Sequence, residues 1–274
     1  ARLTMILPGT HSRRAVCFLD ILGFRGMLNE KSLTEIAELY DRIISQAIGL
    51  NRSFLINSGS PRLFPEMTED EPYCIRYIFS DSIILIARDD DPISCLKLLV
   101  HAWRLVQSTL AHRISVRGAV AYGDMYFDPA KSICLGHGLV NAYELEQKQN
   151  WVGVAIDKAI EEAYPSLFPP ALNPSSIYES LFLRYPVPLK AGGFVHTRTL
   201  NWRWNLVVEH GTRWLFQHTE DIPGQEKIRN ALAYAECVVK SGRVYAEDQG
   251  ACPAELRAMW IGGLEPPFPH GDDL

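Results

Sequence analysis

The sequence predicts an α+β fold, in which helices cover a mostly antiparallel sheet. Short apolar runs alternate with segments whose apolar residues lie three and four positions apart, the pattern of strands followed by amphipathic helices. Two of the apolar runs, 74–79 and 83–87, are separated only by the letters "SDS", which is typical of a β-hairpin. The expected order is strand, helix, hairpin, helix, two strands, helix and strand, followed by a C-terminal extension.

The first half of the chain contains the clearest elements. Residues 15–19 form an apolar strand. A helix is predicted over 32–48, with Ser32 as its N-cap and Glu35 in the position that completes a capping box. Residues 51–72 are polar and rich in turn formers, so we expect a loop or an insertion there.

The second half is predicted by the same rules. A helix over 92–111 follows the acidic letters "DDDP", and the segment 114–128 alternates like a strand, with a turn expected at Gly123 and Asp124. The other expected elements are a helix at 136–147, a strand at 151–157, a helix at 158–164, a Pro-rich break at 165–174, one or two hairpins within 181–218 and an amphipathic helix at 223–242.

The composition of the 274-residue chain indicates one large domain, or a core domain with an extension. A net charge of -5 gives no basic footprint, so we expect no nucleic acid partner. The six cysteines form no CxxC pair, so a reduced, cytoplasmic location is expected. No apolar run approaches the ~20 residues that span a bilayer, and the start of the sequence shows no signal-peptide pattern, so we expect no membrane association.

Two aspartates occupy unusual positions in this pattern. Asp20 closes the strand at 15–19, and Asp81 lies at the turn of the predicted hairpin. Either residue alone is explained as a cap or a turn former. If the two strands are neighbours, however, the two carboxylates converge, and buried carboxylates without a partner are costly. A pair of hard oxygen donors favours Mg²⁺ or Mn²⁺ over Zn²⁺.

The residues that follow Asp20 support this hypothesis. Ile21, Leu22, Gly23 and Phe24 lead directly into a helical segment. Backbone N–H groups at such a strand-to-helix turn form a cradle for phosphate oxygens. A metal ion held by one or two carboxylates usually completes its shell with water and substrate phosphates.

At these residues the sequence resembles the catalytic domain of class III nucleotidyl cyclases. The segments that carry the resemblance are "FLDILGF", "IFSDSIILIA", "VRGAVAYGD" and "GHGLVNAYELE", which together span roughly 14–160. The family usually has Gly where this chain has Ser80. Within the superfamily the sequence is most similar to the bacterial Pycsar antiphage pyrimidine cyclases, which share "FLDxLGF", "FSDS" and "GxGLxxAYxLE".

This resemblance implies a class III cyclase-like fold and a lyase activity. The implied reaction converts UTP, or CTP, to a 3′,5′-cyclic nucleotide and pyrophosphate, with two Mn²⁺ or Mg²⁺ ions per site. Cyclic UMP would then be a second messenger in antiviral defence. The resemblance further implies a homodimer with composite active sites, which we expect in the cytoplasm. The expected domains are a catalytic domain at 14–218 and a C-terminal helix and tail at 219–274. Residues 165–274 could complete the catalytic sheet or form an accessory dimer surface.

The same resemblance assigns roles to individual residues. The metal ligands would be Asp20, Asp81 and the backbone carbonyl of Ile21. Asn141 would contact phosphate or ribose, unless Val140 is its counterpart. Arg117 would be a catalytic cation. The substrate-binding residues would be Phe18, Gly23, Phe24, Arg76 and Tyr77.

Two departures from the family bear on specificity and rate. Purine cyclases read the base with a Lys and an Asp, where this chain has Tyr77 and Ile133; a tyrosine hydroxyl suits a smaller pyrimidine base. The transition-state Arg of the family is replaced by Glu144 or Leu145, so Arg117, Lys148 or an arginine beyond residue 180 would have to supply that charge. A purine cyclase with an unusual pocket, and an inactive nucleotide-binding module, remain as alternatives.

Overall fold

The computed structural model describes residues 10–57, 73–128, 131, 133–168, 181–203, 215–216 and 225–240. The strands are β1 (Thr10–Ile21), β2 (Cys74–Phe79), β3 (Ser82–Ala87), β4 (Val116–Asp128), β5 (Ile133–Gly136), β6 (Gly153–Ile156), β7 (Phe182–Pro188) and β8 (Phe194–Leu200). The helices are α1 (Phe24–Glu30), α2 (Leu33–Asn57), α3 (Pro92–Ala111), α4 (His137–Lys148), α5 (Lys158–Ala163), the short 3-10 helix η2 (Pro165–Leu167) and α7 (Gln225–Lys240).

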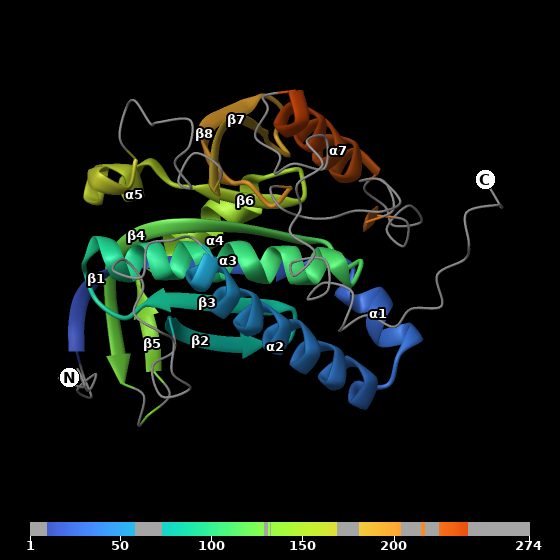
Figure 1. Cartoon of the computed structure of the whole chain (residues 1–274), viewed down its shortest axis with the longest axis horizontal. Coiled ribbons are helices and arrows are strands. Elements are labelled where there is room, and N and C mark those ends of the chain that lie inside the picture. Colours follow the sequence, from blue (N-terminus) through green and yellow to red (C-terminus); the bar gives the residue numbers. More distant parts are fainter. Residues whose placement is uncertain are drawn as a thin grey trace.

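The strands form one sheet in the order β2-β3-β1-β4-β6-β8-β7, with β5 paired to β4 (Figure 1). The pairing of β4 with β6 is parallel, whereas β1 is antiparallel to both β3 and β4. The predicted α+β class, with a mostly antiparallel sheet covered by helices, is therefore confirmed. The hairpin predicted at 74–87 is β2 and β3.

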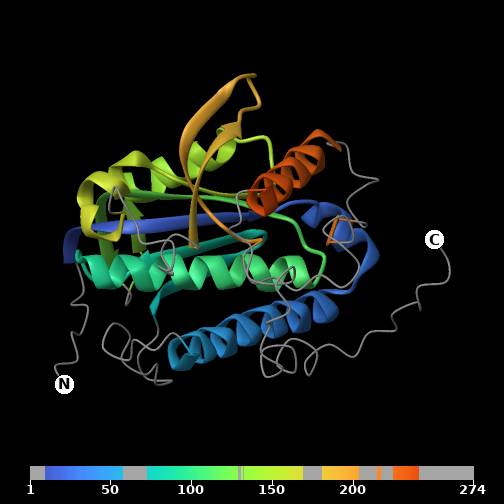
Figure 2. The same ribbon diagram turned by 45° about the horizontal axis from the view of Figure 1, so that its top comes forward.

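The two faces of the sheet are covered by different helices. On β1, Cys17 and Leu19 face α3 and belong to the main core, whereas Phe18 faces the opposite side and packs near Ala142 of α4. Helix α2 packs against the outer side of α3 (Figure 2). Period-two alternation along β1 thus separates a buried structural face from the face that carries Asp20.

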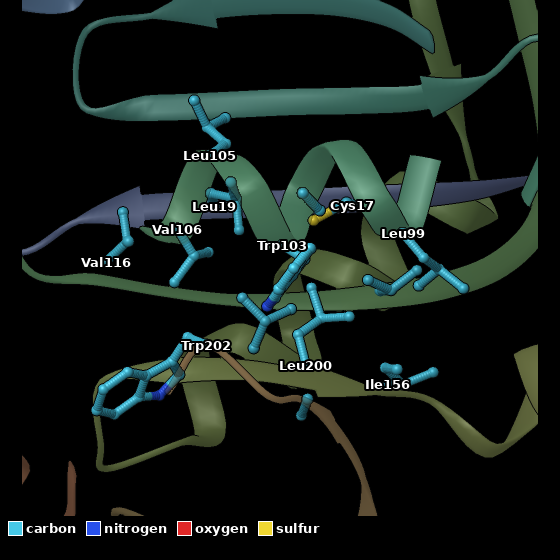
Figure 3. Packing of buried hydrophobic residues seen from close by; sticks show 14 of the residues in the cluster. Cys17, Leu19, Leu99, Trp103, Leu105, Val106, Val116, Ile156, Leu200 and Trp202 are labelled. Carbon is cyan, nitrogen blue, oxygen red and sulfur yellow. The ribbon is translucent and has the colours of Figure 1, made fainter. Parts of the chain in front are cut away.

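The core on the α3 side extends to the C-terminal strands. Trp103 of α3 is fully buried, and its indole N–H donates to the carbonyl oxygen of Asn201 at 2.8 Å, just after β8 (Figure 3). Helix α7 joins the same core through Tyr234, whose hydroxyl donates to the carbonyl oxygen of Leu200 at 3.1 Å. The C-terminal helix is therefore packed against the sheet rather than appended to it.

The turn predicted at Gly123 and Asp124 is wrong, and so is the predicted end of the helix at residue 48. The segment 114–128 contains no turn at Gly123, because β4 runs without interruption from Val116 to Asp128. Gly123 is explained by close packing instead: a β-carbon there would lie 2.6 Å from the backbone nitrogen of Gly138, so the glycine lets the start of α4 rest on β4. Strand β5 was not predicted separately.

Helix α2 is longer than predicted. It continues to Asn57, into the segment expected to be a loop, while residues 58–72 lie outside the described residues. Its predicted start is confirmed: the Glu35 carboxylate accepts from the N–H of Ser32 at 2.8 Å, and the Ser32 hydroxyl accepts from the N–H of Glu35 at 3.3 Å.

In the C-terminal part, the predicted hairpin corresponds to β7 and β8, and the predicted last helix corresponds to α7. The rest of 204–224 is described only at 215–216, and the tail after residue 240 lies outside the described residues. Among the helices that the structure describes, none combines the length and the apolar character required to cross a bilayer.

Candidate active site

The two predicted aspartates lie side by side at one end of the sheet. Asp20 is the penultimate residue of β1, and Asp81 lies in the loop between β2 and β3. Because Ser82 is the register partner of Asp20, this loop is placed beside the end of β1. The N–H of Ile21 donates to the carbonyl oxygen of Asp81 at 2.9 Å. Two aspartates that are distant in the sequence are therefore neighbours in the fold.

The loop that carries Asp81 is a tight turn held by α2. Phe79 pairs with Ser82, so the loop contains only two residues, Ser80 and Asp81. Ser80 has a φ of 56°, in the left-handed region that glycine adopts without strain. The hydroxyl of Tyr40 donates to the carbonyl oxygen of Ser80 at 2.9 Å. Burial, followed by the charges of the two aspartates, raises the pKa of Tyr40 to about 12, so the hydroxyl stays protonated as a donor.

Replacing Ser80 with glycine is expected to stabilise the fold, because it removes the β-carbon from a left-handed backbone. The expected gain in the free energy of unfolding is about 0.5–1 kcal/mol, measured by urea denaturation. The matched control is Ser82→Gly, in the extended backbone of β3, where the greater freedom of glycine should lower stability. Loss of stability in Ser80→Gly would show that the serine side chain itself supports the turn.

A buried ion pair supports Asp20 from the neighbouring strand. Arg117 of β4 is the register partner of Asp20 and is 3% exposed. Its guanidinium donates to the carboxylate of Glu146, a fully buried residue of α4, and to the carbonyl oxygen of Gln149 at 3.2 Å. Arg117 Nη2 lies 3.7 Å from Asp20 Oδ2. The Arg117 charge is thus shared between two carboxylates and is not directed to solvent.

These surroundings raise the pKa of Asp20 to about 6. Burial is the largest cause, followed by the negative charge of Glu146, and Asp81 acts in the same direction. The charges of Arg117 and Lys227 lower the pKa and offset part of the shift. The ionised form of Asp20 is therefore disfavoured mainly by its burial, and a bound cation would stabilise that form.

The donor set fits a divalent cation that binds together with substrate. Asp20 and Asp81 have carboxylate oxygens; the hydrocarbon side chain of Ile21 has no ligand atom, so this residue could offer only its backbone carbonyl. No group of three or more His, Cys, Asp or Glu residues in the described ranges is arranged to hold a metal ion, and Glu146 is already engaged by Arg117. Such a sparse set of oxygen donors suits Mg²⁺ or Mn²⁺, whose remaining positions water and phosphate oxygens fill.

The predicted phosphate cradle is smaller than expected. The N–H of Ile21 is bonded to Asp81, and the N–H of Leu22 donates to the carbonyl oxygen of Ser115 at 2.9 Å, so neither faces a ligand. Gly23 has a φ of 78° and starts α1, in a left-handed conformation that turns the chain away from the sheet. Only the first turn of α1, beginning at Phe24, leaves backbone N–H groups without a helical partner.

The predicted substrate-binding residues fall on both faces of the sheet. Phe18 lies two residues before Asp20 on the same face, and its ring meets that of Tyr143 edge-on at 5.4 Å. Tyr77 of β2 lies in line with Phe18 across β3. Arg76 is directed to the opposite face, so the structure does not bring it to Asp20.

The predicted residues of α4 do not face Asp20 within the chain. Asn141 and Val140 are exposed, whereas Ala142 and Glu146 are buried against the sheet. Lys148, another candidate for the missing cation, lies 3.8 Å from the carboxylate of Glu144 on the surface of the same helix.

Sequence reasoning missed three residues of this site: Tyr40, Glu146 and Lys227. The spacing of Ala142 and Glu146 could have revealed the second, because a Glu four residues after a buried Ala lies on the buried side of α4. No sequence signal pointed to the other two, since each lies in an ordinary amphipathic helix.

No protein-family model matches the chain, and no curated protein matches it in sequence. Several solved structures are similar in fold. A bacterial light-regulated adenylyl cyclase shows a TM-score of 0.43 at 11% identity, over 78% of this chain and 57% of that chain. The adenylyl cyclase CyaB from P. aeruginosa shows 0.41 at 13% identity, over 71% of this chain and 96% of that chain.

A third similar structure is the catalytic core of a rhodopsin-guanylyl cyclase with converted specificity in complex with ATPαS. It shows a TM-score of 0.40 at 11% identity, over 71% of this chain and 98% of that chain. This chain thus spans a little over half the length of the light-regulated cyclase. Likeness at this level is too low to assign an activity, because one fold supports many functions.

Proposed function

We propose that the protein is a nucleotidyl cyclase that converts a nucleoside triphosphate to a 3′,5′-cyclic nucleotide and pyrophosphate. The observation that carries this proposal is the convergence of Asp20 and Asp81, with the N–H of Ile21 bonded to the carbonyl oxygen of Asp81. Both aspartates lie in the segments that resemble the metal-binding motifs of class III cyclases. Phosphoryl transfer requires positioning and charge stabilisation rather than a side-chain nucleophile, which fits a site built from carboxylates and cations.

In this mechanism Asp20 and Asp81 hold the divalent ions against the triphosphate. Bound ions would lower the pKa of the attacking 3′-hydroxyl and neutralise the leaving oxygens. Arg117 keeps Asp20 oriented through its contact at 3.7 Å, and Glu146 fixes the guanidinium. Tyr40 holds the loop of Asp81 in place through the carbonyl oxygen of Ser80. The Asp20 carboxylate and the loop that carries Asp81 are therefore each held by a neighbour before substrate binds.

We further propose that the substrate is a pyrimidine nucleotide, UTP or CTP, and that the product signals phage infection. Tyr77 supports the choice of base: it is half-buried, on the face of Asp20, at the position where purine cyclases have a lysine. Its hydroxyl can donate or accept one hydrogen bond to a small base. Ile133, where the partner of that lysine is expected, offers no side-chain hydrogen bond.

The active form is proposed to be a homodimer with composite sites. Helix α4 packs on β1 and β4 on the Asp20 face, whereas in the described part of the chain it makes no extensive contact with β2 at the sheet edge. Apolar side chains are exposed around this area: Phe79 is 80% exposed, and Val140 and Tyr143 of α4 are about half exposed. A second copy seated there would bury these residues and bring its own Asn141 toward this site.

The experiment is incubation of the purified protein with ATP, GTP, CTP or UTP and Mn²⁺, followed by mass spectrometry of the products. Cyclic UMP or cyclic CMP is expected, and no product is expected from Asp81→Asn. The matched control, Asp41→Asn, changes an exposed aspartate of α2 and should retain activity. Cyclic AMP or cyclic GMP as the main product would refute the pyrimidine assignment.

A second candidate function is a nucleotide-binding module without turnover. The observation that favours it is the engagement of Arg117 by Glu146 and Asp20, which leaves no arginine of α4 or β4 available to bind phosphate. This candidate predicts that the protein binds nucleotide but forms no product in any of the four reactions.

A further inference from the structure

Two lysines from the C-terminal part of the chain lie in elements that pack on the segment after α4, the segment that binds Arg117. Lys190 is in the turn between β7 and β8, and Lys227 is in the first turn of α7. The charges of both lysines interact with those of Arg117, Glu146 and Asp20. Helix α7 and the hairpin lie next to each other (Figure 1). They thus bring positive charge to the Asp20 side of the molecule.

Backbone contacts place the hairpin that carries Lys190 relative to Arg117. The segment after α4 pairs with the hairpin: the N–H of Lys190 donates to the carbonyl oxygen of Lys148 at 2.9 Å, and Gln149 forms a β-bridge with Leu189. The carbonyl oxygen of Gln149 also accepts from Arg117. Leu189, the residue before Lys190, is therefore paired with Gln149, whose carbonyl oxygen accepts from the buried Arg117.

Helix α7 is anchored on the same segment. The side-chain amide of Asn230 donates to the carbonyl oxygen of Asn150 at 2.6 Å. Lys227 lies three residues before Asn230, on the same side of the helix, and is half-buried. Its neighbour Arg229 is exposed. The anchored side of α7 thus presents Lys227 toward the segment that follows α4.

Lys227 occupies an unfavourable electrostatic position in the free protein. Burial lowers the pKa of its ammonium, as do the charges of Arg117 and Lys190, while Asp20 and Glu146 offset part of this effect. No carboxylate in the described part of the chain lies within ion-pair distance of Lys227. The positive end of the helix dipole further disfavours a cation in the first turn. A bound anion would compensate the charge of Lys227 and offset these costs.

We propose that Lys227, with Lys190 beside it, binds the phosphate chain of the nucleotide at the Asp20–Asp81 site of its own chain. This inference rests on the proposed function for the identity of the ligand. In this proposal, α7 supplies a positive charge to the site. Class III cyclases have an arginine on the helix that corresponds to α4, where this chain has Glu144 or Leu145. The triphosphate, held by metal ions at the aspartates, would carry oxygens toward the two ammonium groups, which act as point charges on phosphate.

The test compares full-length wild type with Lys227→Gln, Lys227→Arg and, as a matched control on the exposed side of the same helix, Arg229→Gln. Calorimetry measures the dissociation constant of inorganic tripolyphosphate in EDTA, and kinetics measure KM and kcat for the nucleotide turned over. Loss of one charge-assisted contact should weaken tripolyphosphate binding about 10-fold or more in Lys227→Gln. Lys227→Arg and Arg229→Gln should stay close to wild type in tripolyphosphate affinity. Lys227→Gln should melt no lower than wild type, because it removes a cation that burial disfavours.

The outcomes separate this inference from the cyclase proposal. Turnover by wild type with unchanged KM and tripolyphosphate affinity in Lys227→Gln would overturn the role of Lys227 alone. Lys227-dependent binding of tripolyphosphate without any cyclic product would support that role and overturn the cyclase function. Absence of tripolyphosphate binding by wild type would overturn the inference whatever the activity.

Discussion

Replacing Asp20 with asparagine is expected to abolish turnover and, at the same time, to stabilise the protein that lacks metal. The loss of activity follows from removing one of the two carboxylates proposed to hold the divalent ions. If that ligand contributes several kcal/mol to the transition state, kcat should fall by about 10³-fold or more. Product formation with Mn²⁺ and the preferred nucleotide measures this effect.

The gain in stability follows from the pKa of Asp20, which the folded protein raises from 3.8 to about 6. The folded state then binds the proton more tightly than the unfolded state, so wild type loses stability as the pH rises from about 4 to about 6. At pH 7.5 the neutral asparagine avoids this cost, and Asp20→Asn should be more stable by about 1–2 kcal/mol in EDTA. The advantage should disappear as the pH falls toward 4.

Asp41→Asn is again the matched control, since Asp41 is exposed on α2 and its substitution should change neither quantity. Equal stability of Asp20→Asn and wild type at pH 7.5 would contradict the electrostatic description of the site. A fully active Asp20→Asn would remove this carboxylate from the mechanism.

Replacing Arg117 with methionine is expected to cause the largest loss of stability. Glu146 is fully buried, and without the guanidinium it retains in the described structure only the contact at 2.7 Å from the side-chain amide of Gln147. Breaking one side of a buried ion pair leaves a desolvated charge, which costs about 3–5 kcal/mol. Urea denaturation of the single variant measures this cost.

The double variant Arg117→Met with Glu146→Leu should recover most of the loss, because no isolated charge remains buried. As a surface control, Arg184→Met removes an exposed partner of Glu161, which keeps its contact with Arg198 at 2.9 Å; its cost should stay below about 1 kcal/mol. A double variant as unstable as the single one would show that the arginine stem, not charge pairing, holds α4 on the sheet.

Local patterns in the sequence were sufficient for most elements, and they failed where packing overrides local preference. The capping box of Ser32 and Glu35 correctly marked the start of α2, because its hydrogen bonds join residues three positions apart. Gly123 read as a turn, whereas in the fold it provides space for the start of α4. The local sequence cannot reveal a glycine that is required by close packing against a segment distant in the chain.

The candidate site, too, was predictable from the sequence only in its local features. Residue types and spacing alone indicated a strand ending in Asp20 and a hairpin turn with Asp81, since each depends on a few consecutive residues. Only the tertiary structure joined Arg117 to Glu146 and anchored α7, which carries Lys227, on the segment after α4. These relations depend on strand register, on the packing of α4 and on the position of α7, which are set by contacts across the whole sheet and not by neighbouring residues.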